Sequence, residues 1–220
     1  MNEDIHVEAI RGLPEPLPAG ERLLWQGSPD WRALAIEVFH VRAVCAYALV
    51  LIAWRWATIL HDGGTHAEAA IVALWLLLLP VVACAILAGL AALTAGATVY
   101  TITDQRVVMR IGVALTVTFN LPYTRIASAA YKRSFFGCGE IPLTIAGKER
   151  VSYLVLWPHA RPFLLKNPQP MLRAVPDGER VANLLARALA IHAHQSARSV
   201  APEDARATEP VNAGSTVLAS

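Results

Sequence analysis

One short segment of the chain concentrates residue types that proteins use to recognise one another. Residues 157 to 162 read Trp-Pro-His-Ala-Arg-Pro. The two prolines should hold this loop rigid, and aromatic and arginine side chains often dominate the energy of protein interfaces. A structural turn, with Trp157 buried and Arg161 solvated, would explain the same residues. Trp157, His159 and Arg161 are therefore candidate partner-binding residues.

His40 is a histidine whose position suggests a ligand. It lies where the chain enters its first long apolar stretch, with Glu37 about one turn earlier. A neutral imidazole can ligate a metal ion. An interfacial histidine, hydrogen-bonded to Glu37 or to a lipid headgroup, is the simpler interpretation, and we favour it. His192 and His194 are two residues apart, so a helix would not bring them together on one face as joint metal ligands.

Sequence motifs typical of enzymes do not occur in the chain. The run Phe136-Gly137-Cys138-Gly139 lacks the third glycine and the strand–helix setting of a dinucleotide-binding loop. Neither Gly-x-Ser-x-Gly nor His-Glu-x-x-His is found. Asp104 and Glu140 are isolated carboxylates in predicted turns. The net charge of +2 is too small to indicate nucleic-acid binding. We therefore expect no catalytic residue, no metal site and no nucleic-acid partner.

Two apolar segments precede residues 157 to 162, the recognition loop, and would anchor it to a membrane. Hydrophobic residues make up 55% of the chain, which is high for a soluble domain. We predict a first membrane span over about residues 43 to 60 and a second over residues 69 to 93, which contains no charged residue. A helix of the second length extends about 37 Å, enough to cross the hydrocarbon with tilt. Pro80 should kink it.

Arg55 interrupts the first span near its far end, between Trp54 and Trp56. An arginine near the end of a span can extend to the headgroups, and we favour this interpretation. An Arg55 that faces a partner inside the membrane is the alternative, and it makes this residue a further candidate for partner binding.

The basic residues around the two spans indicate the orientation of the chain. Arginines precede the first span and follow the second, at Arg32, Arg42, Arg106 and Arg110 among others, whereas the connecting loop has no Lys or Arg. The positive-inside rule then places both termini in the cytoplasm. The expected protein is a multi-pass protein of a bacterial inner membrane.

After the second span the sequence pattern changes from helical to β. Short β-branched segments separated by turn residues predict strands over residues 98 to 103, 106 to 112, 115 to 121, 126 to 131, 141 to 146 and 151 to 157. One amphipathic helix should follow over residues 177 to 195. About six or seven strands and a closing helix form the plan of a pleckstrin-homology-like (PH-like) barrel.

The expected fold class is thus a membrane α-helical hairpin followed by an α+β domain. We predict an extended cytoplasmic segment over residues 1 to 30, a transmembrane hairpin over 31 to 97, a cytoplasmic PH-like domain over 98 to 195, and a disordered tail over 196 to 220.

Two sets of residues resemble known families. Residues 100 to 112, Tyr-Thr-Ile-Thr-Asp-Gln-Arg-Val-Val-Met-Arg-Ile-Gly, resemble the opening hairpin of bacterial membrane-anchored PH-like domains. Four further stretches resemble the PuhB family of photosynthetic complex assembly proteins of purple phototrophic bacteria, with Trp-Pro-His-Ala-Arg-Pro as the most specific part. These stretches are residues 17 to 32, 38 to 42, 156 to 162 and 169 to 173.

The family resemblance implies an assembly factor for the photosynthetic reaction centre–light-harvesting 1 core complex, acting in the intracytoplasmic membrane by binding proteins. It implies reaction-centre and light-harvesting 1 subunits as partners, beside membrane lipid, and no resident cofactor. Under this interpretation His40 would be a candidate for transient binding of bacteriochlorophyll through its magnesium. The alternative function is a generic membrane-anchored PH-like module that binds lipid or another membrane protein. The sequence leaves a homo-oligomer open.

Overall fold

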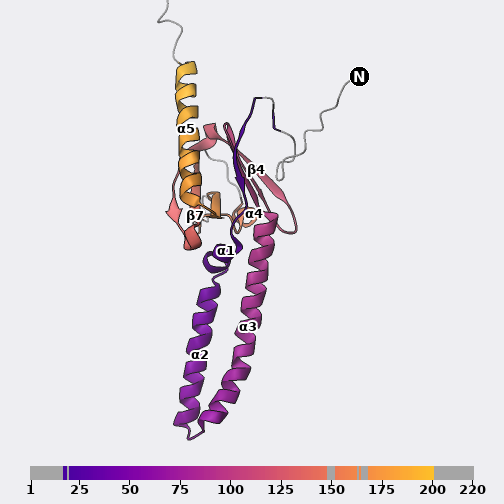
Figure 1. Cartoon of the computed structure of the whole chain (residues 1–220), viewed down its shortest axis with the longest axis vertical. Coiled ribbons are helices and arrows are strands. Elements are labelled where there is room, and N and C mark those ends of the chain that lie inside the picture. Colours follow the sequence, from indigo (N-terminus) through magenta and orange to yellow (C-terminus); the bar gives the residue numbers. More distant parts are fainter. Residues whose placement is uncertain (1–16, 19, 148–151, 163, 165–167, 201–220) are drawn as a thin grey trace, which may run out of the picture.

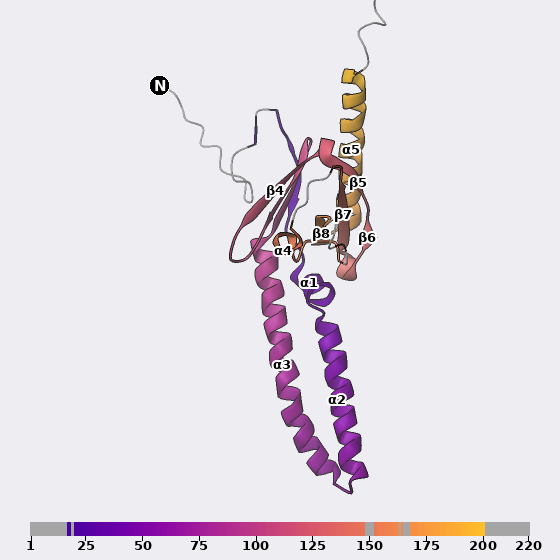
Figure 2. The same ribbon diagram turned by 180° about the vertical axis from the view of Figure 1, so that it is seen from behind.

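A long helical hairpin and a β domain occupy opposite ends of the molecule (Figure 1). This computed structural model describes residues 17–18, 20–147, 152–162, 164 and 168–200. Helices α2 and α3 form the hairpin, the strands and helix α5 form the β domain, and the short helix α1 lies between them, as the reverse view also shows (Figure 2). The predicted fold class is therefore confirmed: two long apolar helices are followed by a β region and a closing helix.

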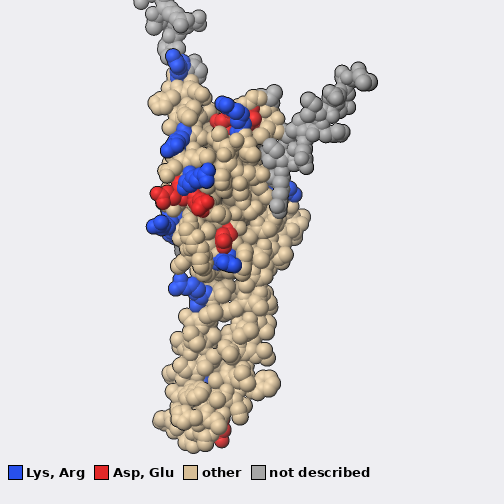
Figure 3. Space-filling view, viewed as in Figure 1, with Lys and Arg blue, Asp and Glu red and all other residues tan. Residues whose placement is uncertain are grey.

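Helices α2 (Val41–His61) and α3 (His66–Ala97) are long and apolar enough to cross a membrane. Their 21 and 32 residues correspond to lengths of about 31 and 48 Å. The most apolar 18-residue stretch of each helix is not buried inside the protein. On the face shown in Figure 3, Lys, Arg, Asp and Glu gather over the β domain and are nearly absent from the hairpin. This large apolar surface is unlike that of a soluble monomer.

The two long helices are joined by a short turn that starts α3 with a capping box. The Thr65 side chain accepts a hydrogen bond from the Glu68 backbone N–H at 3.3 Å, and the Glu68 carboxylate accepts from the Thr65 N–H at 3.1 Å. Such reciprocal bonds satisfy two of the N–H groups that a helix start leaves free. Pro80 lies inside α3, and the helix continues past it.

Helix α1 (Trp31–Glu37) connects the β domain to the hairpin. The Asp30 carboxylate caps it by accepting hydrogen bonds from the N–H groups of Arg32 and Ala33 at 2.7 and 3.1 Å. Its buried face packs against Ala91 of α3 and Ala174 of the β domain. His40, with a left-handed φ of 52°, separates α1 from α2. The hairpin segment predicted to start at residue 31 thus begins with a separate short helix.

Over the residues that the structure describes, the β domain consists of two four-stranded sheets in which all neighbouring strands are antiparallel. The first has the order β1-β2-β3-β4; in the second, β7 pairs with β5, β6 and β8. The strands of the first sheet are β1 (Leu23–Gly27), β2 (Val99–Thr103), β3 (Arg106–Ile111) and β4 (Val117–Pro122). Those of the second are β5 (Ile126–Ala129), β6 (Lys132–Arg133), β7 (Gly139–Ile145) and β8 (Met171–Val175).

The structure differs from the sequence predictions at five places. Strand β1 lies in the segment predicted to be extended, and it pairs with β2 and completes the first sheet. Neither the two-residue strand β6 nor strand β8 was predicted. Residues 153 to 156 of a predicted strand form the short helix α4 (Tyr153–Leu156) instead. Helix α5 (Gly178–Val200) continues five residues into the predicted tail, and residues 201 to 220 lie outside the described residues.

One apolar core joins both sheets to α5. Tyr100, Ile102 and Met109 of the first sheet contact Ile141 and Leu172 of the second within one cluster of buried residues. The face of α5 that carries Val181, Leu185 and Ala188 closes this cluster. Because these three residues recur at helical spacing, a single stripe of α5 is buried and the rest of the helix remains available to solvent.

Candidate functional site

The recognition loop predicted at residues 157 to 162 follows α4 at the end of the β domain that faces the hairpin. Trp157 is 53% exposed, and its ring meets the edge of Phe39 with centroids 5.9 Å apart. Arg161 is exposed, and its Nη1 donates to the Gln169 side chain at 3.1 Å. Trp157–Pro158 is a cis peptide bond. Trp157 and Arg161 therefore both have accessible surface for a partner.

His159, the third residue of this prediction, lies in the interior with no exposed surface. Its Nδ1 lies 2.6 Å from the Tyr100 hydroxyl and its Nε2 lies 3.1 Å from Thr98 Oγ1. The prediction that His159 binds a partner is wrong for this structure, because both ring nitrogens are already occupied inside the protein. A histidine flanked by prolines gave no sign of its burial in the sequence.

The hydrogen bonds around His159 determine which nitrogen carries its proton. The Thr98 hydroxyl donates to the Thr94 carbonyl at 2.7 Å, so its oxygen must accept from Nε2–H. The Tyr100 hydroxyl accepts from the Arg173 backbone N–H at 3.2 Å and donates to Nδ1. Each hydroxyl has one hydrogen to donate, so this arrangement satisfies every group with a neutral imidazole.

Burial of the ring, and to a smaller extent the positive charge of Arg173, lower the pKa of His159 from 6.5 to about 3. Burial likewise raises the pKa of Tyr100 far above its usual value. Both groups are therefore uncharged over the physiological range. They join the end of α3 to strand β2 and to the recognition loop, and they offer neither an acid–base pair nor a free ligand.

We expect this network to make the protein sensitive to acid. Because the folded pKa of His159 lies below its unfolded value, the unfolded chain binds more protons, and stability falls as pH drops below 6.5. Between pH 7.5 and pH 5.0 this one group should cost about 2 kcal/mol. The measurement is the free energy of unfolding of the full chain at both pH values. His159→Phe cannot titrate and should lose this part of the pH dependence; an unchanged difference would contradict the assignment.

A buried ion pair lies next to this network. Arg173 on β8 donates from Nε and Nη2 to Glu140 Oε1 at 3.1 and 2.9 Å, and from Nη1 to the Pro158 carbonyl at 3.2 Å. Both side chains are nearly inaccessible, and Lys132 reaches the second carboxylate oxygen at 3.4 Å. Burial alone would raise the pKa of Glu140, but Arg173 holds it below its usual value. Glu140 is thus not the isolated turn carboxylate that the sequence suggested.

Glu37 fixes α1 to the β domain. The Ser134 hydroxyl donates to its carboxylate at 2.5 Å. Burial, and the neighbouring Glu140 carboxylate, raise the pKa of Glu37, although the bond from Ser134 opposes them. The simpler interpretation of His40 had Glu37 as its hydrogen-bond partner. In the structure the Glu37 carboxylate accepts from Ser134 instead. His40 itself is exposed and makes no side-chain cap bond, so its interpretation as a pigment ligand stays a prediction.

Arg55 lies on the exposed surface of α2. Its Nη1 donates to the Thr58 hydroxyl at 3.3 Å, and that hydroxyl donates to the Arg55 carbonyl at 2.8 Å. It borders a shallow hollow between α2 and α3 whose lining includes Trp54 and Trp75. This setting is compatible with extension toward headgroups and with a partner-facing charge, so the role of Arg55 stays a prediction.

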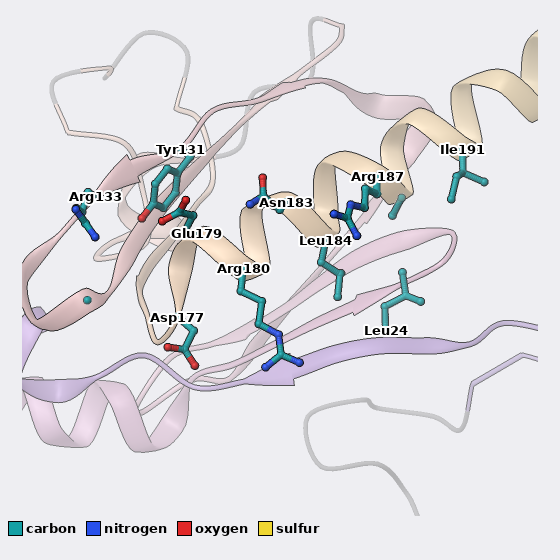
Figure 4. A pocket seen from close by; sticks show the side chains of 12 residues that line it. Leu24, Tyr131, Arg133, Asp177, Glu179, Arg180, Asn183, Leu184, Arg187 and Ile191 are labelled. Carbon is teal, nitrogen blue, oxygen red and sulfur yellow. The ribbon is translucent and has the colours of Figure 1, made fainter.

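A groove that the sequence did not predict runs along α5 (Figure 4). It has a volume of about 950 Å³ and lies between α5, β1 and the segment that includes β6. Leu184 and Arg180 extend from α5 toward β1, which carries Leu24 (Figure 4). Arg187 and Ile191 continue the same helix face. The groove thus combines an apolar floor with arginines and with the carboxylates of Asp177 and Glu179. Its arginine-lined part suits an apolar segment that carries acidic groups.

Within the part of the chain that the structure describes, no group of three or more His, Cys, Asp and Glu side chains is placed to hold a metal ion. Accessible residues with recognition chemistry include those of two surfaces, the groove along α5 and the loop that carries Trp157 and Arg161.

Fold and site together define a PH-like β domain mounted on an apolar helical hairpin. The chain belongs to the bacterial PH domain family, whose model matches residues 33–189. It is 41% identical over 188 residues to a Rhodobacter capsulatus relative described as an uncharacterized 23.7 kDa protein in the puhA 5′ region, a match that covers 85% of this chain and 88% of the relative. Among solved structures, a protein with a pleckstrin-homology domain from Shewanella loihica is 14% identical, with a TM-score of 0.27, over 42% of this chain and 68% of that one.

Proposed function

We propose that the protein is a membrane-anchored assembly factor for the photosynthetic reaction centre–light-harvesting 1 core complex, and that it acts by binding proteins. The observation that carries the proposal is the 41% identical relative, whose gene region is that of puhA in Rhodobacter capsulatus. That location points to a photosynthesis-related function. The Trp-Pro-His-Ala-Arg-Pro segment resembles photosynthetic complex assembly proteins, as do residues 17 to 32, 38 to 42 and 169 to 173. This resemblance supports the same role.

The membrane is the proposed location, with the hairpin crossing it twice and both termini in the cytoplasm. The two long helices expose apolar residues along their length, and exposed apolar surface of this size favours lipid. The turn between them and the first turn of α3 carry Asp62 and Glu68 but neither Lys nor Arg, whereas Arg32 and Arg42 lie at the other end of the hairpin. This charge distribution supports a turn on the periplasmic side.

The surfaces that the structure describes suit binding better than catalysis. Outside the hairpin, the groups whose pKa is shifted are buried or half-buried, such as His159, which bonds to Tyr100, and Glu140, which accepts from Arg173. The accessible groups, in the α5 groove and around Trp157 and Arg161, offer apolar surface and guanidinium groups. The partners we propose are reaction-centre and light-harvesting 1 polypeptides together with membrane lipid. A generic module for lipid or for another membrane protein is the second candidate, favoured only by the family match.

Deletion of the gene tests this proposal. We expect the deletion strain to grow normally by respiration but to lose near-infrared absorbance of the reaction centre–antenna core, because assembly and not housekeeping metabolism depends on the protein. Absorbance spectra of membranes and pull-down during pigment induction would measure both parts. A normal amount of core complex, with a defect in lipid composition or stress response instead, would reject the assembly role in favour of the generic module.

A further inference from the structure

The β domain exposes several large apolar side chains at the end from which the hairpin emerges. Elsewhere in the described part of the domain, most such side chains belong to the α5 groove or its neighbouring strand β1. Exposed apolar groups confined to one end of a domain indicate a binding surface. The members of this group are Trp31, Val113, Leu115, Phe135, Phe136, Val155 and Trp157.

The first part of this surface is the turn between β3 and β4. Strand β2 starts directly after α3, and Val99 on β2 pairs with Arg110 on β3. The turn that follows β3 is therefore held at the end of α3, as Figures 1 and 2 both show. Gly112 has a φ of 110°, and a Cβ there would collide with the Leu115 carbonyl oxygen. This tight turn leaves Leu115 83% exposed.

The second part is the short 3-10 turn η2 (Phe135–Gly137) between β6 and β7, beside the start of α2. The Arg42 guanidinium lies 5.1 Å from the centre of the Phe135 ring. The bond from Ser134 to Glu37 holds the same turn against α1. Phe136 is 65% exposed, with a left-handed φ of 57°. A non-glycine residue at positive φ is uncommon, and strain of this kind is found most often at functional positions.

Aromatic and basic side chains lie between these two tips. Trp157 contacts Phe39 in the segment that joins α1 to α2. The Arg32 guanidinium lies 5.6 Å from the ring of Trp31. Arg32 and Arg42 are both exposed. Amphipathic rings and arginines with these neighbours are typical of the headgroup zone of a membrane.

We propose that the β3–β4 turn and the η2 turn insert their apolar tips into the headgroup zone of an anionic bilayer, on either side of the point where the hairpin enters it. Trp31 begins α1 and Trp157 follows α4, and both short helices lie between the tips (Figure 2). The arginines that accompany them attract negatively charged headgroups. The β domain thereby contacts the membrane at three places, the hairpin and two loops, instead of being attached through the hairpin alone.

The position of the two tips selects lipid over a protein as their occupant. One tip adjoins the end of α3 and the other adjoins the start of α2, so a bilayer that surrounds both helices reaches both tips at once. Charge is complementary as well, because Arg32 and Arg42 are exposed at this end. The inference rests on the membrane placement proposed above and not on the assembly role.

Nitroxide labels on the full chain in lipid nanodiscs with and without phosphatidylglycerol test this placement. Cys45, Cys84 and Cys138 are first replaced by alanine, and single cysteines are introduced as Leu115→Cys and Phe136→Cys, with Val113→Cys and Phe135→Cys as second reports on each tip. Ile191→Cys on α5 is the exposed control and Leu79→Cys in α3 is the control inside the span. The measurement is collision of each nitroxide with oxygen and with a water-soluble nickel chelate.

We expect both tips to be shielded from nickel several-fold relative to position 191, and more strongly when phosphatidylglycerol is present. Shielding at position 79 together with tips as accessible as position 191 would overturn the inference, leave the membrane placement intact, and assign the tips to a protein partner. Free access of nickel to position 79 would instead reject the membrane placement itself. Equal shielding with and without phosphatidylglycerol would overturn the preference for anionic lipid.

Discussion

Replacing Arg173 by methionine should lower the free energy of unfolding by about 3 to 5 kcal/mol. The reason is that Glu140, whose side chain is 6% exposed, would keep its charge in the interior without its main partner. Arg173 also donates to the Pro158 carbonyl, so the recognition loop would lose its attachment to β8. Chemical unfolding of the full chain in detergent micelles at pH 7.5 measures the loss.

Glu140→Gln combined with Arg173→Met is the matched control for this prediction. The double variant leaves no unpaired buried charge, so it should recover a large part of the loss. The contribution of Glu140 to the response to acid should have opposite signs in the wild type and in Arg173→Met. In the wild type the lowered pKa of Glu140 means that stability is lost as pH falls through it. In Arg173→Met, burial would raise that pKa, so protonation should restore stability. A loss below about 1 kcal/mol, as for an exposed pair, would show that water reaches the carboxylate.

The helical hairpin and most of β2 to β7 could be predicted because their signals are local. Long apolar runs predict α2 and α3, and β-branched alternation predicts strands such as β2, β3 and β4, which pair in sequence order. Strand β1 escaped prediction because its five residues, Leu-Leu-Trp-Gln-Gly, have little alternation, and its pairing partner β2 lies more than 70 residues away. Strand β8 lies among prolines, which mask a strand pattern.

The most specific resemblance turned out to describe a structural unit. The segments 156 to 162 and 169 to 173 pair with each other: the Met171 N–H donates to the His159 carbonyl at 2.8 Å, and the Arg161 N–H donates to the Gln169 carbonyl at 2.9 Å. His159 and Arg173 then carry the buried polar network. Sequence could show that these residue types recur together, but not that two of them point inward, because burial depends on the sheet that β7 and β8 form.

The α5 groove had a weak signal in the sequence. Arg180, Leu184, Arg187 and Ile191 recur at spacings of three and four, which places them on one side of a helix. This stripe borders the core stripe of Val181 and Leu185, so the apolar pattern of α5 is wider than a core contact alone requires. Only the position of Leu24, and therefore β1, turns this stripe into the wall of a groove.

Reversing the charge of the two groove arginines that α5 carries, as Arg180→Glu with Arg187→Glu, should reduce capture of reaction-centre and antenna polypeptides by about tenfold or more. Both arginines lie on the outer side of α5 away from the core, so the abundance of the protein in membranes should stay near that of the wild type. The measurements are pull-down yield from membranes during pigment induction and near-infrared absorbance of the assembled core, each related to protein abundance.

Arg198→Glu makes the same change of charge type on α5 outside the lining of the groove and is the matched control, with capture expected near that of the wild type. Arg161→Ala compares the second surface: the loop should contribute a smaller loss, because Arg161 keeps a contact with Gln169 and offers one guanidinium instead of two. An equal loss of capture in Arg198→Glu would show that net charge, and not the groove, causes the effect. A loss in Arg161→Ala greater than that of the groove variant would place the main partner contact on the recognition loop, beside the membrane surface rather than along α5.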